Sequence, residues 1–103
     1  MTLPKAYVGT VENIVCTFRI ASTASVDDPV TVTVEVKAPT AVAVTYTYGA
    51  PGSPLLRRSE GVYYLPLTYT EAGTWGFIWH GVGAGHAEGT QQEGRTVSAR
   101  LFP

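Results

Sequence analysis

Residues Glu71-Ala72-Gly73-Thr74-Trp75-Gly76-Phe77-Ile78-Trp79 combine a tight turn with an aromatic ring at every second position of the segment that follows it. Successive side chains of a β-strand point to opposite faces of the sheet, so Trp75, Phe77 and Trp79 share one face. Rings of this size bury a large apolar area, and three on one face predict the central strand of a β-sandwich. Packing alone explains their spacing, so the segment indicates architecture and no ligand.

The rest of the chain has the same β character. Prolines and glycines interrupt it about every 8–12 residues, a spacing typical of short antiparallel strands. Pro66 donates no ladder hydrogen bond, so we expect it at an edge or a bulge. The alternation of valine with polar residues predicts a strand over residues 30–37, which pairs as a hairpin with residues 42–48. The other predicted strands are residues 7–20, 55–59 at a sheet edge, 61–68, and 96–102 beside the aromatic strand.

The length of 103 residues fits one domain covering residues 1–103. Seven basic and eight acidic side chains give a net charge of -1 without a basic stripe, which argues against a nucleic-acid partner. No apolar run is long enough to cross a bilayer, and the first residues lack the apolar region of a signal peptide, so we expect no membrane association and no export. Cys16 is the only cysteine, and its alternating surroundings predict a buried thiol.

The turn and strand at residues 71–77 resemble the acidic-x-Gly-x-Tyr-x-Cys segment of immunoglobulin-like domains. Trp75 stands in the tyrosine place and Phe77 in the cysteine place. With Cys16 as the only cysteine, the disulfide of antibody domains is missing. The resemblance implies an all-β protein, a single immunoglobulin-like antiparallel β-sandwich of about seven strands.

A closer resemblance is to small immunoglobulin-like structural proteins encoded among the head and tail genes of tailed bacteriophages. It spans residues 7–100. The matching segments are Thr17-Phe18-Arg19, Gly61-Val62-Tyr63, Ala72-Gly73-Thr74-Trp75 leading to Trp79-x-Gly81-x-Gly83, and Gln91-Gln92-Glu93-Gly94 before the final strand. This resemblance implies a structural role in the virion and carries over no catalytic residue.

Catalytic chemistry finds little support in the residues themselves. His80 and His86, with Glu71, Glu88 and Glu93 as possible partners, lack the close spacing of a helical zinc motif. No serine lies in a Gly-x-Ser-x-Gly elbow. We therefore expect no enzymatic activity, cofactor or metal, and a metal-dependent enzyme that uses His80 and His86 is the last of three hypotheses.

Three peripheral segments are the predicted contact surfaces: an extended N-terminal arm at residues 1–6 together with Tyr7, a loop at 50–58, and residues 83–94 of a long glycine-rich loop at 81–94. Such a loop loses much entropy on ordering, which contact with a partner can offset. The residues expected to touch partners are Tyr7, Arg57, Arg58, His86, Glu88, Gln91, Gln92 and Glu93. The alternative for Arg57-Arg58-Ser59-Glu60 is a charged strand edge that discourages aggregation.

The leading hypothesis is a non-enzymatic component of a tailed-phage virion: a capsid decoration, a neck or head-tail connector, or a tail protein. It predicts assembly in the host cytoplasm, binding to other phage structural proteins, and a symmetric homo-oligomer or multi-copy array. The alternative is a carbohydrate-binding or adhesion module of a surface protein. That alternative predicts exposed coplanar aromatic rings, for which Tyr46, Tyr48, Tyr63 and Tyr69 are the candidates.

Overall fold

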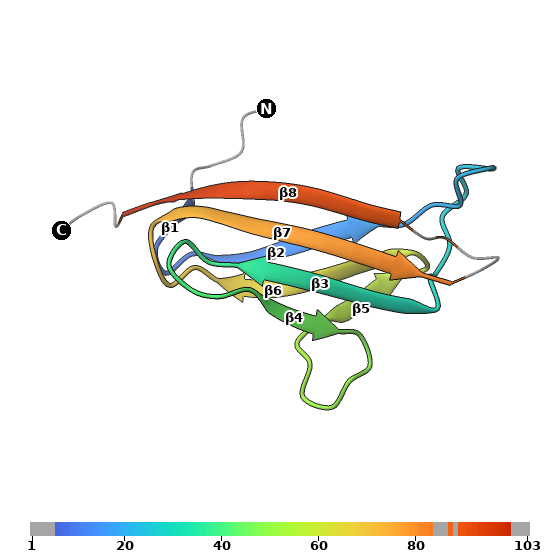
Figure 1. Ribbon diagram of the computed structural model, residues 1–103, viewed down its shortest axis with the longest axis horizontal. Helices are drawn as coiled ribbons and strands as arrows, with labels where there is room; N and C mark the ends of the chain where they lie inside the picture. Colours follow the sequence, from blue (N-terminus) through green and yellow to red (C-terminus); the bar gives the residue numbers. More distant parts are fainter. Residues whose placement is uncertain (1–5, 84–86, 88, 100–103) are drawn as a thin grey trace.

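The computed structural model describes residues 6–83, 87 and 89–99. Over these residues the chain forms eight β-strands and no helix, arranged in two sheets that face each other (Figure 1). The strands are β1 (Ala6–Tyr7), β2 (Val11–Thr17), β3 (Thr31–Lys37), β4 (Val44–Thr47), β5 (Leu56–Ser59), β6 (Val62–Thr68), β7 (Gly73–Val82) and β8 (Gly89–Ser98).

The strand order is that of an immunoglobulin-like sandwich. One sheet has the order β1-β8-β7-β3-β4 and the other the order β2-β6-β5. All pairs are antiparallel except the short pair of β1 with β8. The predicted fold class, an all-β sandwich without a disulfide, is confirmed, and Cys16 is free and buried.

The aromatic strand lies at the centre of the larger sheet, as predicted. Trp75, Phe77 and Trp79 on β7 are 4%, 1% and 1% exposed. The valines of β3 that face the same way are also buried, and the smaller sheet supplies the opposite wall of the core. The principal residues of that wall are Ile14, Cys16, Phe18, Tyr63 and Leu65.

The turn before β7 is stabilised by one hydrogen bond within its own segment and by contacts with residues 39–40. The indole Nε1 of Trp75 donates a hydrogen bond of 3.0 Å to the carbonyl oxygen of Glu71, as the tyrosine of an immunoglobulin corner does with its hydroxyl. The Glu71 carboxylate accepts hydrogen bonds from the backbone nitrogen and hydroxyl of Thr40, at 2.9 and 2.8 Å. Gly73 has a φ of +128°, and a Cβ there would lie 2.7 Å from the ring of Pro39. This corner therefore requires glycine.

The predicted first strand, residues 7–20, is wrong in one respect, because the chain changes sheets within it. β1 belongs to the larger sheet and β2 to the smaller one. Gly9, with a φ of +95°, turns the chain between them, and its nitrogen donates to the carbonyl oxygen of Tyr69 at 2.8 Å. A left-handed glycine is the physical reason for the break.

The predicted long loop over residues 81–94 is also wrong. β7 continues to Val82 and β8 begins at Gly89, so residues 89–94 form a strand. Gly81 pairs with Gly89 and Gly76 with Gly94, because ladder hydrogen bonds join backbone groups and need no side chain. Residues 84–86 and 88, in the connection between the two strands, lie outside the described residues.

Two other expectations for strands are confirmed, and one is corrected in length. β5 is an edge strand, and it pairs with β6 only as far as Tyr64, which leaves Pro66 without a neighbour on that side. β3 and β4 form the predicted hairpin. The strand predicted over residues 42–48 is limited to Val44–Thr47.

Candidate interaction site

The structure separates the predicted contact residues into two groups on opposite flanks. Arg57 and Arg58 lie on β5, at one edge of the smaller sheet. Gln91, Gln92 and Glu93 lie on β8, beyond the other edge of that sheet (Figure 1). Tyr7 is half-buried in β1. The remaining two predicted residues, His86 and Glu88, lie outside the described residues.

Arg57 forms an intramolecular ion pair with Asp28. Its Nε and Nη2 donate to the two carboxylate oxygens of Asp28 at 3.1 and 2.9 Å. The same carboxylate accepts hydrogen bonds from the nitrogen of Gly61 at 2.7 Å and the hydroxyl of Tyr63 at 3.0 Å. The bond from Arg57 is the main reason why the pKa of Asp28 falls to about 2. Arg57 therefore stabilises the loop before β3 against the smaller sheet.

Arg58 points to the outer face of the smaller sheet. Its guanidinium carbon lies 5.2 Å from the centre of the Tyr64 ring, a cation–π contact. Leu56, which pairs with Tyr64 and shares this face, is 43% exposed. Charge and a register shift between Arg57 and Ser59 mark β5 as a protected edge, which agrees with the alternative interpretation of this segment.

The three predicted residues of β8 point in alternating directions. Gln91 and Glu93 pair with the inward-facing Trp79 and Phe77, whereas Gln92 pairs with Ile78 and faces outward. The amide Nε2 of Gln91 donates to the carbonyl oxygen of Thr17 at 2.8 Å. This bond joins β8 to β2 and so bridges the two sheets at one flank.

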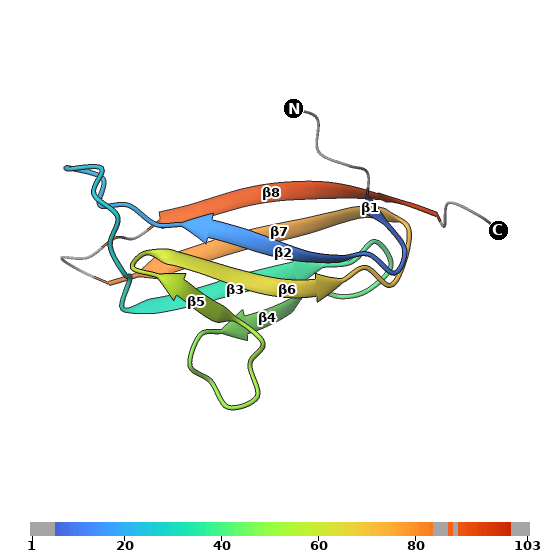
Figure 2. The ribbon, with the colours of Figure 1, turned by 180° about the vertical axis from the view of Figure 1, so that it is seen from behind.

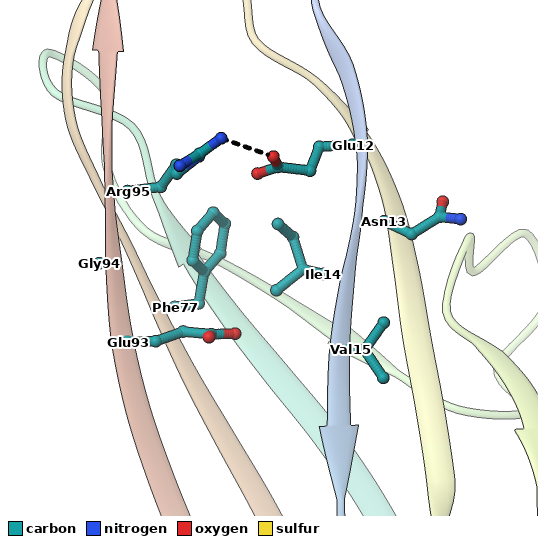
Figure 3. Close-up of a pocket in the computed structure, with 8 residues that line it drawn as sticks. All are labelled: Glu12, Asn13, Ile14, Val15, Phe77, Glu93, Gly94 and Arg95. Atoms are coloured by element: carbon teal, nitrogen blue, oxygen red, sulfur yellow. Dashed lines mark hydrogen bonds and ion pairs between the residues drawn. The ribbon is translucent and has the colours of Figure 1, made fainter. Parts of the chain in front are cut away.

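A groove runs along this flank between β2 and β8 (Figure 3). Its volume is about 340 Å³. Near one end Arg95 and Glu12 form an ion pair of 2.9 Å, and the Tyr69 hydroxyl donates a hydrogen bond to the other oxygen of Glu12. Burial, and then this bond to Glu12, raise the pKa of Tyr69. The groove is lined by Glu12, Asn13, Ile14, Val15, Phe77, Glu93, Gly94 and Arg95.

Glu93 stands alone in the groove. Its side chain points from β8 toward β2, below the ring of Phe77 (Figure 3). Within the described part of the chain no hydrogen bond or ion pair reaches it. Its negative charge adds to burial in raising the pKa of the Cys16 thiol to about 12. The groove thus contains two carboxylates: that of Glu12, which is paired with Arg95, and that of Glu93, which is available to a cation.

Sequence reasoning missed the residues that shape this flank, above all Glu12 and Arg95. They are 83 positions apart, and no local pattern links them. Asp28 was missed as well, because its place before Pro29 gives no sign of the four hydrogen bonds that its carboxylate accepts. One signal for this flank was present in the sequence of β2, where Val11 and Val15 lie on the face opposite the buried Ile14 and Cys16. Exposed apolar residues on an edge strand are unusual and indicate a contact surface.

The rings proposed as an exposed stacking platform are mostly internal. Tyr63 and Tyr69 are buried and Tyr46 is half-buried, whereas Tyr48 is 42% exposed and packs edge-on against Tyr63 at 5.1 Å between centres. Among the described residues, Tyr48 is the one exposed large aromatic ring. A coplanar strip for sugar stacking is therefore absent from this part of the chain.

Within the described ranges no three histidine, cysteine, aspartate or glutamate side chains are grouped as metal ligands. The same ranges contain no helix of the length and apolar character that would cross a membrane. No protein-family model, curated protein or solved structure matches this chain.

Proposed function

We propose that this protein is a non-enzymatic structural component of a tailed-phage virion that binds other virion proteins through the flank formed by β2 and β8. The observation that carries this proposal is that both sheets end there in largely unpaired strands. Among the described residues β2 pairs only with β6, and β8 pairs with β1 over only two residues. The phage context itself rests on the sequence resemblance.

The distribution of aromatic residues supports binding of proteins in preference to small molecules. Trp75, Phe77 and Trp79 fill the core, so they are not offered to a ligand. Open strand edges present backbone donors and acceptors, which extended protein segments satisfy. A module repeated by the symmetry of a particle gains avidity from many such contacts, even when each one is weak.

The test is whether the protein belongs to the particle. Virions purified through a density gradient from an infected host would be probed for the chain by quantitative mass spectrometry. The expected result is a constant copy number per particle that fits the symmetry of the capsid, neck or tail. An abundant host protein serves as the contamination control.

Absence of the chain from washed particles refutes the proposal. A glycan array with the isolated protein tests the adhesion alternative, and saturable binding to a defined sugar would favour that alternative instead.

A further inference from the structure

We propose that an extended segment of a partner protein adds to β2 as a fourth strand of the smaller sheet and places a basic side chain beside Glu93. The inference rests on the proposed function for the nature of the partner, a protein, and it names the site and the chemistry of the contact. Backbone pairing supplies the docking, and side chains facing the groove supply the selectivity.

Along the open side of β2 the backbone groups of Val11, Asn13 and Val15 have no partner among the described residues, whereas the Thr17 carbonyl oxygen accepts the hydrogen bond from Gln91. The Phe18 nitrogen bonds to the carbonyl oxygen of Gly61, and the Thr10 carbonyl oxygen accepts from Tyr69, so even-numbered residues direct their peptide groups toward β6. By alternation, the peptide groups of Val11, Asn13 and Val15 face away from the sheet. A new strand at the usual spacing of about 4.8 Å can bond to them.

Of the features that normally block strand addition, this edge has one, the inward-pointing Glu12, whose charge is paired with Arg95. β2 contains no proline or lysine, and its register with β6 runs without a bulge from Val11 to Thr17. The opposite edge of the same sheet, β5, has two arginines and a register shift. Of the two edges of this sheet β5 is thus the better protected, which makes the open side of β2 the candidate for docking.

The larger sheet leaves room for a strand at this position. Apart from the two-residue β1 at one end, β8 is the outermost strand of the flank in both views, beyond β2 (Figures 1 and 2). A strand beside β2 would therefore lie over the inner face of β8, in the groove of about 340 Å³. In constant-type immunoglobulin sandwiches the corresponding sheet has four strands, and the described residues here supply three.

The two faces of the position specify different side chains. Toward the groove, the added strand meets Glu93, whereas Glu12 is already paired with Arg95. On the outer face it meets Val11 and Val15, which are 67% and 39% exposed. The matching segment alternates apolar residues with polar ones and has lysine or arginine at the position that faces Glu93.

The probe is a short synthetic peptide in which valine alternates with threonine and one central threonine is replaced by lysine. The matched control peptide has glutamate in place of the lysine. Binding to the whole protein is followed by isotope-edited NMR. We expect slower hydrogen exchange at the amides of Val11, Asn13 and Val15, and about five- to tenfold tighter binding of the lysine peptide.

Two variants separate this site from general stickiness. Glu93→Lys should reverse the preference, so that the glutamate peptide binds more tightly. Asn13→Pro removes an outward-facing donor without breaking the ladder to β6 and should abolish the protection, whereas Asn13→Thr should retain it. Circular dichroism spectra and melting curves verify that each variant is folded.

Equal affinity for the two peptides, protection at β5 instead of β2, or no binding of either peptide overturns the proposal. These outcomes are independent of the particle test, because a protein found in virions that fails to bind the peptides retains its proposed function and loses only this docking site.

Discussion

Replacement of Asp28 by asparagine tests the best-connected polar contact in the described structure. The carboxylate receives hydrogen bonds from Arg57, Gly61 and Tyr63, and asparagine keeps its shape while removing its charge. A fall in the pKa of Asp28 from 3.8 to about 2 corresponds to about 2.4 kcal/mol in favour of the charged form. The side chain is 35% exposed, so solvent screening reduces this contribution to about 1–1.5 kcal/mol.

The dependence on pH follows from the direction of the shift. Because the folded protein holds the proton of Asp28 less tightly than the unfolded chain does, the contribution is fully present above about pH 4. It disappears as the pH falls through the folded pKa of about 2. The Asp28→Asn variant should therefore lose about 1–1.5 kcal/mol of unfolding free energy near pH 7 and resemble the wild type near pH 2.

Urea unfolding followed by circular dichroism measures this difference at each pH. Glu60→Gln is the matched control, because Glu60 is exposed and has no hydrogen bond or ion pair to another described residue. A variant as stable as the wild type near pH 7, or a deficit that stays constant down to pH 2, would refute the reasoning.

Three further predictions concern the core and the corner before β7. Gly73→Ala should cost about 2–3 kcal/mol of unfolding free energy, since φ is positive and Pro39 lies against the new Cβ, whereas Gly76→Ala, with open space and extended backbone, should change it by less than about 1 kcal/mol. Trp75→Phe removes the indole hydrogen bond of the corner and should cost about 1–3 kcal/mol in urea unfolding, and a variant of unchanged stability would contradict this role. Burial raises the pKa of Cys16 to about 12, so an aromatic disulfide reagent should react with the folded protein far more slowly than with the urea-unfolded chain, and equal rates would show that the thiol is accessible.

Regular alternation made much of the fold predictable. The alternating rings of β7 and valines of β3 predicted buried faces, and Pro66 predicted a position without a neighbouring strand on one side. Side-chain alternation and the missing proline donor both act within a few residues, so a local sequence pattern reveals them. The glycine-rich start of β8 was not predictable in this way. Its pairing depends on the backbone of β7, and composition alone favours a loop.

The candidate site was less predictable than the fold, for a related reason. Gln91 and Glu93 were named from their segment, but the groove exists because β2 lies opposite them, with Glu12 and Arg95 closing one end. Arg57 was predicted as a contact residue, but its ion pair with Asp28, which is 29 residues away in the sequence, was not predicted. Contacts of this kind depend on the topology of both sheets, which a single sequence does not display.

Both tryptophans of the chain lie on β7 between the sheets, 4% and 1% exposed. The protein therefore contains its own optical reporter of the interior, whose emission should be blue-shifted in the native state and move to the red only when the two layers separate. Tyr69, 5.3 Å from the Trp75 ring, is close enough to pass excitation to it. A ligand attached at the periphery should leave this spectrum unchanged, so light emission distinguishes attachment from loss of the native state in a single cuvette.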